Sequence, residues 1–263
     1  MARSVWPAVP ADALVLVPVG STEQHGPHLP LNTDSVIARS VARSAAERLA
    51  SGGPDRPVLL APAIAYGASG EHAAFPGTVS IGHEALRLVL VETVRSLSLW
   101  AGRIVFVNGH GGNVPTLDAA VGQLRGEGHD VSWLNCEIPG GDAHAGRAET
   151  SVLLHLVPGD VRLAEAVPGE TRPLADLMPD LIARGVRALS PSGVLGDPTG
   201  ATAEEGRVSF ESMVATAVRR ITAGRAASRG RLIDTSTTSA TPGRPGAAMP
   251  GEPPTPRTKS AHP

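Results

Sequence analysis

The sequence predicts an α/β protein, a three-layer α/β/α sandwich with a mostly parallel central sheet. Two observations lead to this fold class. Short, valine-rich apolar runs alternate along the chain with longer segments whose apolar residues recur at helical spacing, which is the order of strand–helix–strand units in a parallel sheet. The first of the short runs is also apolar throughout, as in a strand that helices cover on both faces.

The first strand is predicted at Ala13–Val19, a continuous apolar run that ends at Gly20. A helix is predicted next at Ser35–Ala50, because its apolar residues recur on one helical face. Asp34 stands directly before this segment and is a candidate N-cap. Val58–Ile64 is the second predicted strand, and a glycine-rich loop follows it.

The same alternation continues to residue 222. Aligned apolar residues predict helices, and short buried runs such as RIVFV predict strands. In chain order, the further elements are helix His83–Trp100, strand Arg103–Val107, a helix from Asn113 to about Arg125, strand Asp130–Leu134, and helices Ala148–Leu156 and Glu204–Thr222. Strands separated by helices in this way imply right-handed crossovers and parallel pairing.

Composition bounds the domain organisation and the partners. Of the 263 residues 41% are hydrophobic, enough for one domain with a substantial core, predicted at residues 1–223. Residues 224–263 are poor in large apolar side chains and rich in proline, which predicts a low-complexity, disordered tail. A net charge of −2 and 3% aromatic residues argue against a nucleic-acid partner. The single Cys136 excludes an internal disulfide.

The chain has no candidate membrane segment. No apolar run approaches the roughly 18–20 residues that cross a bilayer, and the N-terminus lacks the apolar core of a signal peptide. We therefore expect a cytoplasmic protein that binds no membrane.

The residues suited to chemistry lie in the loops after the predicted strands. Because the carboxyl ends of parallel strands meet at one edge of a sheet, we expect these loops to converge. They are Gly20–Pro30 with Asn32 and Asp34 close behind, Gly67–His72, Asn108–Asn113, and Gly140–Gly146, which precedes Glu149. Six of the nine histidines lie in or near them: His25, His28, His72, His110, His144 and His155.

Histidine and carboxylate groups without thiolates form the ligand set of Zn²⁺, Mn²⁺ or Fe²⁺. Glu23 and His25 are two residues apart and point to the same side of an extended loop, and the two oxygens of Asp34 could bridge two ions. His110 would complete one coordination sphere. Two such ions about 3.5–4 Å apart activate water and polarise a carbonyl.

Two other interpretations of these loops stay open at this point. Glu-x-His pairs are often solvated surface groups, and glycine-rich loops after strands also bind phosphate. Asn108–Asn113, however, has the spacing of neither a P-loop nor a dinucleotide fingerprint.

The longest motif, Ser21-Thr22-Glu23-Gln24-His25-Gly26-Pro27-His28-Leu29-Pro30 with Thr33-Asp34, resembles the creatininase family of amidohydrolases. The resemblance extends over about residues 12–222. It includes Phe75-Pro76-Gly77-Thr78, Asn108-Gly109-His110-Gly111-Gly112-Asn113, His144-Ala145-Gly146 with Glu149-Thr150-Ser151, and Gly193 with Gly196-Asp197-Pro198. Ala65–His72 and Glu149–Leu156 are most similar to members that act on a ribosomally made precursor peptide with a modified C-terminal Val-Tyr.

The resemblance implies a creatininase-like fold with two divalent metal ions per subunit, Fe²⁺, Zn²⁺ or Mn²⁺. The implied ligands are Glu23, His25, bridging Asp34 and His110, and the implied catalytic histidine is His144. Creatinine hydrolases carry a further glutamate ligand where this chain has Gly112, which argues against creatinine as the substrate. Glu149 is expected to fill that coordination position or to act as general base. We expect substrate contacts from His28, Glu71, His72, Gly111, Gly112 and Asn113.

The implied activity is hydrolysis of an amide bond, with release of the modified dipeptide during biosynthesis of a redox cofactor and with His144 moving a proton to the leaving amine. One alternative is another amidohydrolase of the family, acting on a creatinine-type cyclic amide or on a formamide as a deformylase. A second alternative is a non-enzymatic protein that only binds the precursor. Family members assemble into rings, commonly hexamers, so a homo-oligomer is expected.

Overall fold

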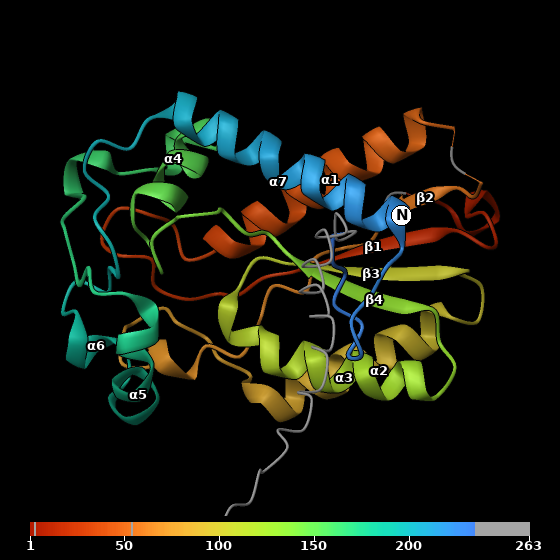
Figure 1. Cartoon of the computed structure of the whole chain (residues 1–263), viewed down its shortest axis with the longest axis horizontal. Helices are drawn as coiled ribbons and strands as arrows, with labels where there is room; N and C mark the ends of the chain where they lie inside the picture. Colours follow the sequence, from red (N-terminus) through yellow and green to blue (C-terminus); the bar gives the residue numbers. More distant parts are fainter. Residues whose placement is uncertain (3, 54, 235–263) are drawn as a thin grey trace, which may run out of the picture.

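The computed structural model describes residues 1–2, 4–53 and 55–234. Within these residues the centre is a four-stranded parallel sheet in the order β2-β1-β3-β4. The strands are β1 (Leu14–Val19), β2 (Val58–Leu60), β3 (Arg103–Asn108) and β4 (Val131–Asn135). Helices cover both faces of the sheet (Figure 1), which confirms the predicted three-layer α/β/α arrangement.

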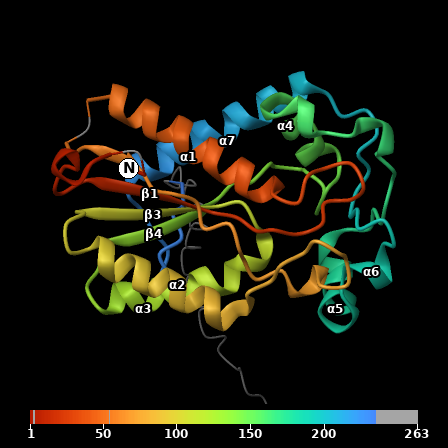
Figure 2. The same ribbon diagram turned by 180° about the vertical axis from the view of Figure 1, so that it is seen from behind.

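The helices divide between the two faces, as the view from behind also shows (Figure 2). On one side lie α1 (Thr33–Ser51), α7 (Ala203–Ala223) and α4 (Arg147–Leu156), and on the other lie α2 (Gly82–Leu97) and α3 (Val114–Gly126). Two more helices, α5 (Leu174–Arg184) and α6 (Val186–Leu189), pack on the short 3₁₀ helix Gly70–His72. No helix in the described part of the chain is long and apolar enough to cross a membrane.

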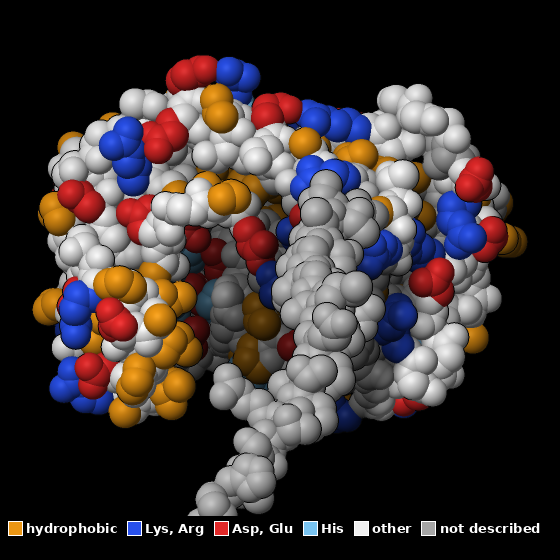
Figure 3. All heavy atoms as spheres, viewed as in Figure 1, with side chains coloured by type: hydrophobic (Ala, Val, Ile, Leu, Met, Phe, Trp, Pro, Cys, Tyr) orange, Lys and Arg blue, Asp and Glu red, His pale blue; other side chains and the backbone are white. Residues whose placement is uncertain are grey.

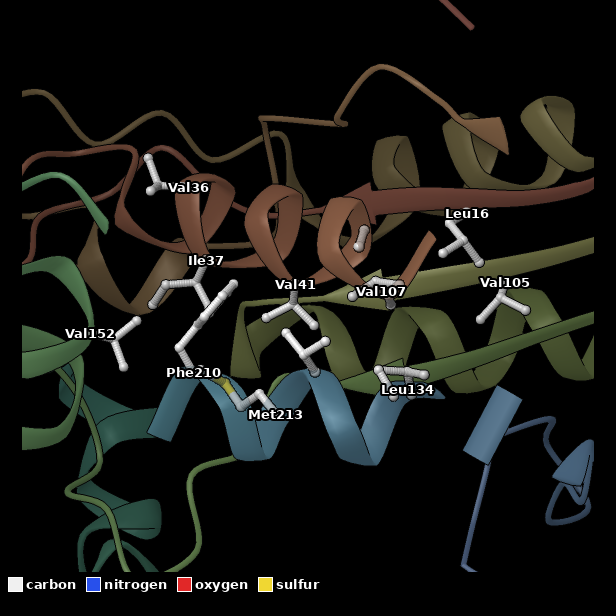
Figure 4. Close-up of a cluster of buried hydrophobic side chains, with 14 of the residues drawn as sticks. Leu16, Val36, Ile37, Val41, Val105, Val107, Leu134, Val152, Phe210 and Met213 are labelled. Atoms are coloured by element: carbon white, nitrogen blue, oxygen red, sulfur yellow. The ribbon is translucent and has the colours of Figure 1, made fainter. Parts of the chain in front are cut away.

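Successive residues of a strand point to opposite faces, and both faces of this sheet are buried. Leu16 of β1 packs with Val105 and Leu134 in the core under α1 and α7 (Figure 4). Val15 and Val17, their neighbours in sequence, belong to the separate core under α2 and α3. Helix cover on both sides therefore explains why β1 is apolar at every position.

The structure differs from the predicted elements at three places. β2 ends at Leu60 instead of Ile64, because an extra residue interrupts the ladder: Ala61 and Ile64, three residues apart, donate to the carbonyls of Leu16 and Pro18, two residues apart. Ile64 returns only as a single bridge to Val19. Asp34 does not cap a helix; it lies inside the first turn of α1, where its carboxylate accepts a hydrogen bond from Ser21 Oγ at 2.6 Å. The helices α5 and α6 were not predicted.

The packed chain also extends past the domain boundary predicted at residue 224. The N–H of Trp133 donates to the carbonyl of Gly230 at 3.0 Å, and the N–H of Leu232 donates to the carbonyl of Trp133 at 2.7 Å. The side chain of Leu232 is buried in the core under α1 and α7. Residues 224–234 therefore pack against the domain, and the rest of the predicted tail, 235–263, lies outside the described residues.

Candidate metal centre

Loops at the carboxyl ends of the strands bring four of the predicted metal ligands together in the interior of the protein. Glu23 and His25 follow β1, Asp34 comes from the first turn of α1, and His110 follows β3. One oxygen of Asp34, Oδ1, lies 3.1 Å from His25 Nε2, and the other, Oδ2, lies 3.2 Å from His110 Nδ1. His110 Nε2 is 3.2 Å from Glu23 Oε2. Asp34 thus faces a different histidine with each oxygen, as a bridging carboxylate would.

The segment before α4 adds two more candidate ligands to the same place. The ligand atoms of His25, His144 and Glu149 lie within 4.8 Å of one another, and so do those of Glu23, Asp34 and His110. A third set, Glu23 with His72 and His144, satisfies the same limit. His72, which the sequence suggested as a substrate contact, is therefore buried beside the candidate ligands.

The Glu23 side chain indicates that this centre is built for a cation. It is completely buried, and neither carboxylate oxygen has a hydrogen-bond partner. Burial raises the pKa of Glu23 to about 7, although His110 beside it acts in the opposite direction. Because an unsatisfied buried carboxylate is costly, a positive ion at this position would stabilise it.

The orientation of the nearby histidines supports the same conclusion. His25 Nδ1 lies 3.1 Å from the carbonyl oxygen of Glu23, so that Nε2 is left to face Asp34. His110 Nε2 lies 3.0 Å from the carbonyl oxygen of Ala68, so that Nδ1 faces the same carboxylate. Metal-binding histidines commonly donate their second N–H to a carbonyl in this way. The residues present therefore fit a divalent metal ion.

In the metal-free protein the carboxylates keep these histidines protonated. Burial alone would lower the pKa of His110, but Glu23 and Asp34 outweigh it and raise the pKa to about 10. Burial is likewise outweighed at His25, where Asp34 raises the pKa to about 9. Since a metal ion needs the imidazole lone pair, its binding must displace protons from this centre.

The predicted substrate contacts fall into different surroundings. Asn113 is completely buried, its Oδ1 accepts the N–H of Ala68 at 2.9 Å and its Nδ2 donates to the carbonyl of Gly20 at 3.0 Å. Its side chain therefore ties loops together, and the substrate contact expected at Asn113 stays a prediction. His28 is buried against Thr150, with Nε2 2.8 Å from Oγ1.

Glu71, Gly111 and Gly112 lie closer to the centre. Glu71 Oε1 is 3.8 Å from His110 Nε2. A cavity of about 200 Å³ lies beside the centre, and Gly111, His110 and Glu149 line it together with apolar Ile37 and Met213. In the space-filling view, acidic and histidine side chains are visible inside a hollow of the molecule (Figure 3).

Two polar residues at the centre were missed from the sequence. Ser21 donates to Asp34, and the side-chain amide of Gln24 lies 2.8 Å from His72 Nδ1. Both stand in the first motif beside the predicted ligands, and that position was the only available signal.

Residues 3–221 match the family described as creatininase, creatinine amidohydrolase. With this fold, this histidine–carboxylate centre and this match, the protein is a hydrolase that acts on C–N bonds. The chain belongs to the creatininase family, as its motifs predicted.

The relatives include proteins named for peptide processing and for creatinine hydrolysis. The mycofactocin precursor peptide peptidase of Mycolicibacterium smegmatis is 60% identical over 209 residues, which cover 79% of this chain and 84% of that protein. The creatinine amidohydrolase of Pseudomonas putida is 30% identical and covers 77% of this chain and 86% of that protein.

Solved structures show the same fold. A putative creatinine amidohydrolase from Bacteroides fragilis has a TM-score of 0.71 at 29% identity, covering 82% of this chain and 92% of that one. A structure described as creatininase Mn has a TM-score of 0.63 at 30% identity, covering 79% and 89%.

Proposed function

We propose that this protein is a metal-dependent peptidase that releases the modified C-terminal Val-Tyr dipeptide from the mycofactocin precursor peptide during biosynthesis of a redox cofactor. The observation that carries the reaction type is the buried Glu23 carboxylate, which has no hydrogen-bond partner and lies among His110, Asp34 and His25. The substrate rests on relatives named mycofactocin precursor peptide peptidase, which are 56–60% identical over most of this chain.

Two divalent ions per subunit would be held by the clustered side chains. Glu23, Asp34 and His110 form one set, and His25 with Glu149 forms the other, with Asp34 between them. When bound, such ions supply an activated water and polarise the scissile carbonyl. Iron, zinc and manganese all suit these nitrogen and oxygen ligands.

His144 is the residue we assign to proton transfer. Its Nε2 lies 2.8 Å from the carbonyl oxygen of Gln24, which leaves the Nδ1 lone pair facing Glu23, with 3.7 Å from Nδ1 to Oε1. His144 Nδ1 can take a proton from the attacking water and give it to the amine nitrogen as the C–N bond breaks. Glu149 holds this segment, because its Oε2 accepts the N–H of Ala145 at 2.7 Å.

The cavity beside His110 and Glu149 is the place we assign to the C-terminal residues of the peptide. Its apolar wall of Ile37, Ile138 and Met213 suits an apolar side chain next to the scissile bond. We also propose a cytoplasmic location, since the precursor is made on ribosomes.

We further propose a homo-oligomer, a hexamer or a similar ring. Leu174, Met178 and Ile182 of α5 are 45%, 42% and 80% exposed at helical spacing. An apolar stripe of this kind is suited to contact with a second copy.

The experiment compares metal-loaded and metal-stripped protein acting on the modified precursor peptide, with the products identified by mass spectrometry. We expect metal-dependent release of the Val-Tyr-derived fragment, no release by His110→Ala, and strongly reduced release by His144→Ala. His129→Ala, which changes a histidine outside the centre, is the matched control and should retain activity.

An intact peptide in the presence of bound metal would reject this substrate. Creatinine and small formamides would then be tested on the same preparations, because relatives at 30% and 38% identity are a creatinine amidohydrolase and a deformylase.

A further inference from the structure

The side-chain amide of Gln24 is held in one orientation by two backbone groups. Its Oε1 accepts the N–H of Gly26 at 2.9 Å, and its Nε2 donates to the carbonyl of Gly193 at 3.0 Å. Exchanging oxygen and nitrogen would set an NH₂ against an N–H and an oxygen against a carbonyl oxygen. Gly193 has a φ of +84°, and a Cβ there would overlap the Gln24 amide, so this residue must be glycine for the amide to fit.

The second hydrogen of this amide points to His72. Gln24 Nε2 lies 2.8 Å from His72 Nδ1, and because Nε2 is a donor, Nδ1 must present its lone pair. A neutral His72 therefore carries its proton on Nε2, which lies 3.4 Å from Glu23 Oε1. His144 does not compete for the amide, since its Nε2–H donates to the carbonyl of Gln24.

His72 is thereby the reverse of the other histidines at the centre. His25, His110 and His144 each place one nitrogen on a backbone carbonyl and turn the other toward the carboxylates. At His72, Nδ1 accepts a hydrogen bond from the Gln24 amide, and Nε2 turns its N–H toward the carboxylate of Glu23.

We propose that Gln24 fixes His72 as the Nε2–H tautomer, so that His72 turns an N–H toward Glu23 and is not a metal ligand. Gln24 and His72 are then positioning residues: the Nε2–H of His72 faces Glu23 Oε1 across 3.4 Å, and Oε2, which lies 3.2 Å from His110 Nε2, is left on the side of the cation. This inference deepens the proposed function and rests on it only for the presence of the cation.

The tautomer can be measured directly in the metal-free protein. Long-range ¹H–¹⁵N spectra of ¹⁵N-histidine-labelled protein distinguish protonated from unprotonated ring nitrogens, and His72→Gln identifies the His72 signals. We expect an unprotonated Nδ1 at His72. In Gln24→Leu the His72 signals should move toward the Nδ1–H tautomer, while those of His25 and His110 stay unchanged.

A protonated Nδ1 and unprotonated Nε2 at His72 in the unaltered protein would overturn the proposal, and this measurement needs no folded Gln24 variant. An unchanged His72 tautomer in folded Gln24→Leu would overturn the role of Gln24.

Zinc titration tests the second half of the proposal. His72→Gln keeps an NH₂ donor near Glu23, so we expect its Kd for Zn²⁺ to rise by about tenfold, the lower end of the range for residues that only orient a ligand. His110→Gln removes a ligand and should raise the Kd far more. An equal rise in the two variants would make His72 a ligand and refute the proposal. Neither measurement uses the peptide, so a failed cleavage assay leaves both results interpretable.

Discussion

Gly112 stands two residues after His110, where the protein has no room for a side chain. A Cβ at this position would overlap the carbonyl oxygen of Ala68 and the His110 ring nitrogen, and would lie 2.8 Å from Glu71 Oε1. The Ala68 carbonyl is the group that lies 3.0 Å from His110 Nε2. At Gly111 a Cβ would meet no atom within 4 Å, so the adjacent glycine supplies a matched control.

We predict that Gly112→Ala destabilises the metal-free protein by about 1–3 kcal/mol, the usual cost of overpacking, because a backbone carbonyl cannot swing aside. At about 2–4 °C per kcal/mol for a domain of this size, the melting temperature falls by roughly 2–12 °C. The Kd for Zn²⁺ should also rise about 10–100-fold, since the partner that orients His110 moves. Gly111→Ala should be neutral or stabilising by up to about 1 kcal/mol.

Circular dichroism melts of the two metal-free variants and zinc titration by competition with a chelating dye measure both effects. Equal melting temperatures and equal zinc affinities in the two variants would refute this reasoning, because the lack of space for a Cβ at residue 112 is the reason for both predicted differences.

Three further predictions concern protonation, loop geometry and packing. Zinc affinity should rise with pH through the neutral range and zinc binding should release protons, because His25 and His110 have pKa values raised to about 9 and about 10. Calorimetry in two buffers of different ionisation enthalpy measures the proton release. A pH-independent Kd for Zn²⁺ would contradict the prediction. Asp142 accepts hydrogen bonds from the N–H groups of Arg147 and Ala148 at the start of α4 and from the N–H of Asp197 in a separate loop. Asp142→Ala should therefore cost about 1–2 kcal/mol in urea unfolding and lower kcat, whereas Asp142→Asn, which keeps one acceptor, should lose less. Leu90→Ala should lower the free energy of unfolding by about 2–5 kcal/mol, because Leu90 is buried. Leu88→Ala, on the same helix but 60% exposed, should lower it by less than about 0.5 kcal/mol. Similar losses in the two variants would contradict the packing of α2.

The sequence predicted the sheet and its helices well because burial there leaves a regular pattern. β1 is apolar at every position and β3 is apolar from Ile104 to Val107, and α2 repeats Leu86, Leu90 and Val94 at helical spacing. α5 was harder to predict. It carries Pro179 in its interior and buries little more than Leu177 and Leu181, so its helical pattern is short and interrupted.

At the candidate centre, the convergence of the loops could be predicted but the partner of each nitrogen could not. Parallel strands bring their carboxyl ends to one edge, which was enough to group Glu23, His110 and His144. The environment of His72 depends on the side-chain amide of Gln24, which lies 48 positions away in sequence and on the backbone of Gly193. Contacts between side chains of separate loops leave no periodic signal in a single sequence.

The segment at residues 230–232 has a consequence for the solubility of the chain. β4 is the outer strand on its side of the sheet, and an uncovered outer strand offers free N–H and C=O groups to other molecules. Here the backbone of Trp133 is occupied by Gly230 and Leu232, and its indole Nε1–H donates to the carbonyl of Arg229 at 3.3 Å. A chain shortened to residue 224 would expose this strand edge and favour edge-to-edge aggregation, although it would keep every residue of the candidate metal centre.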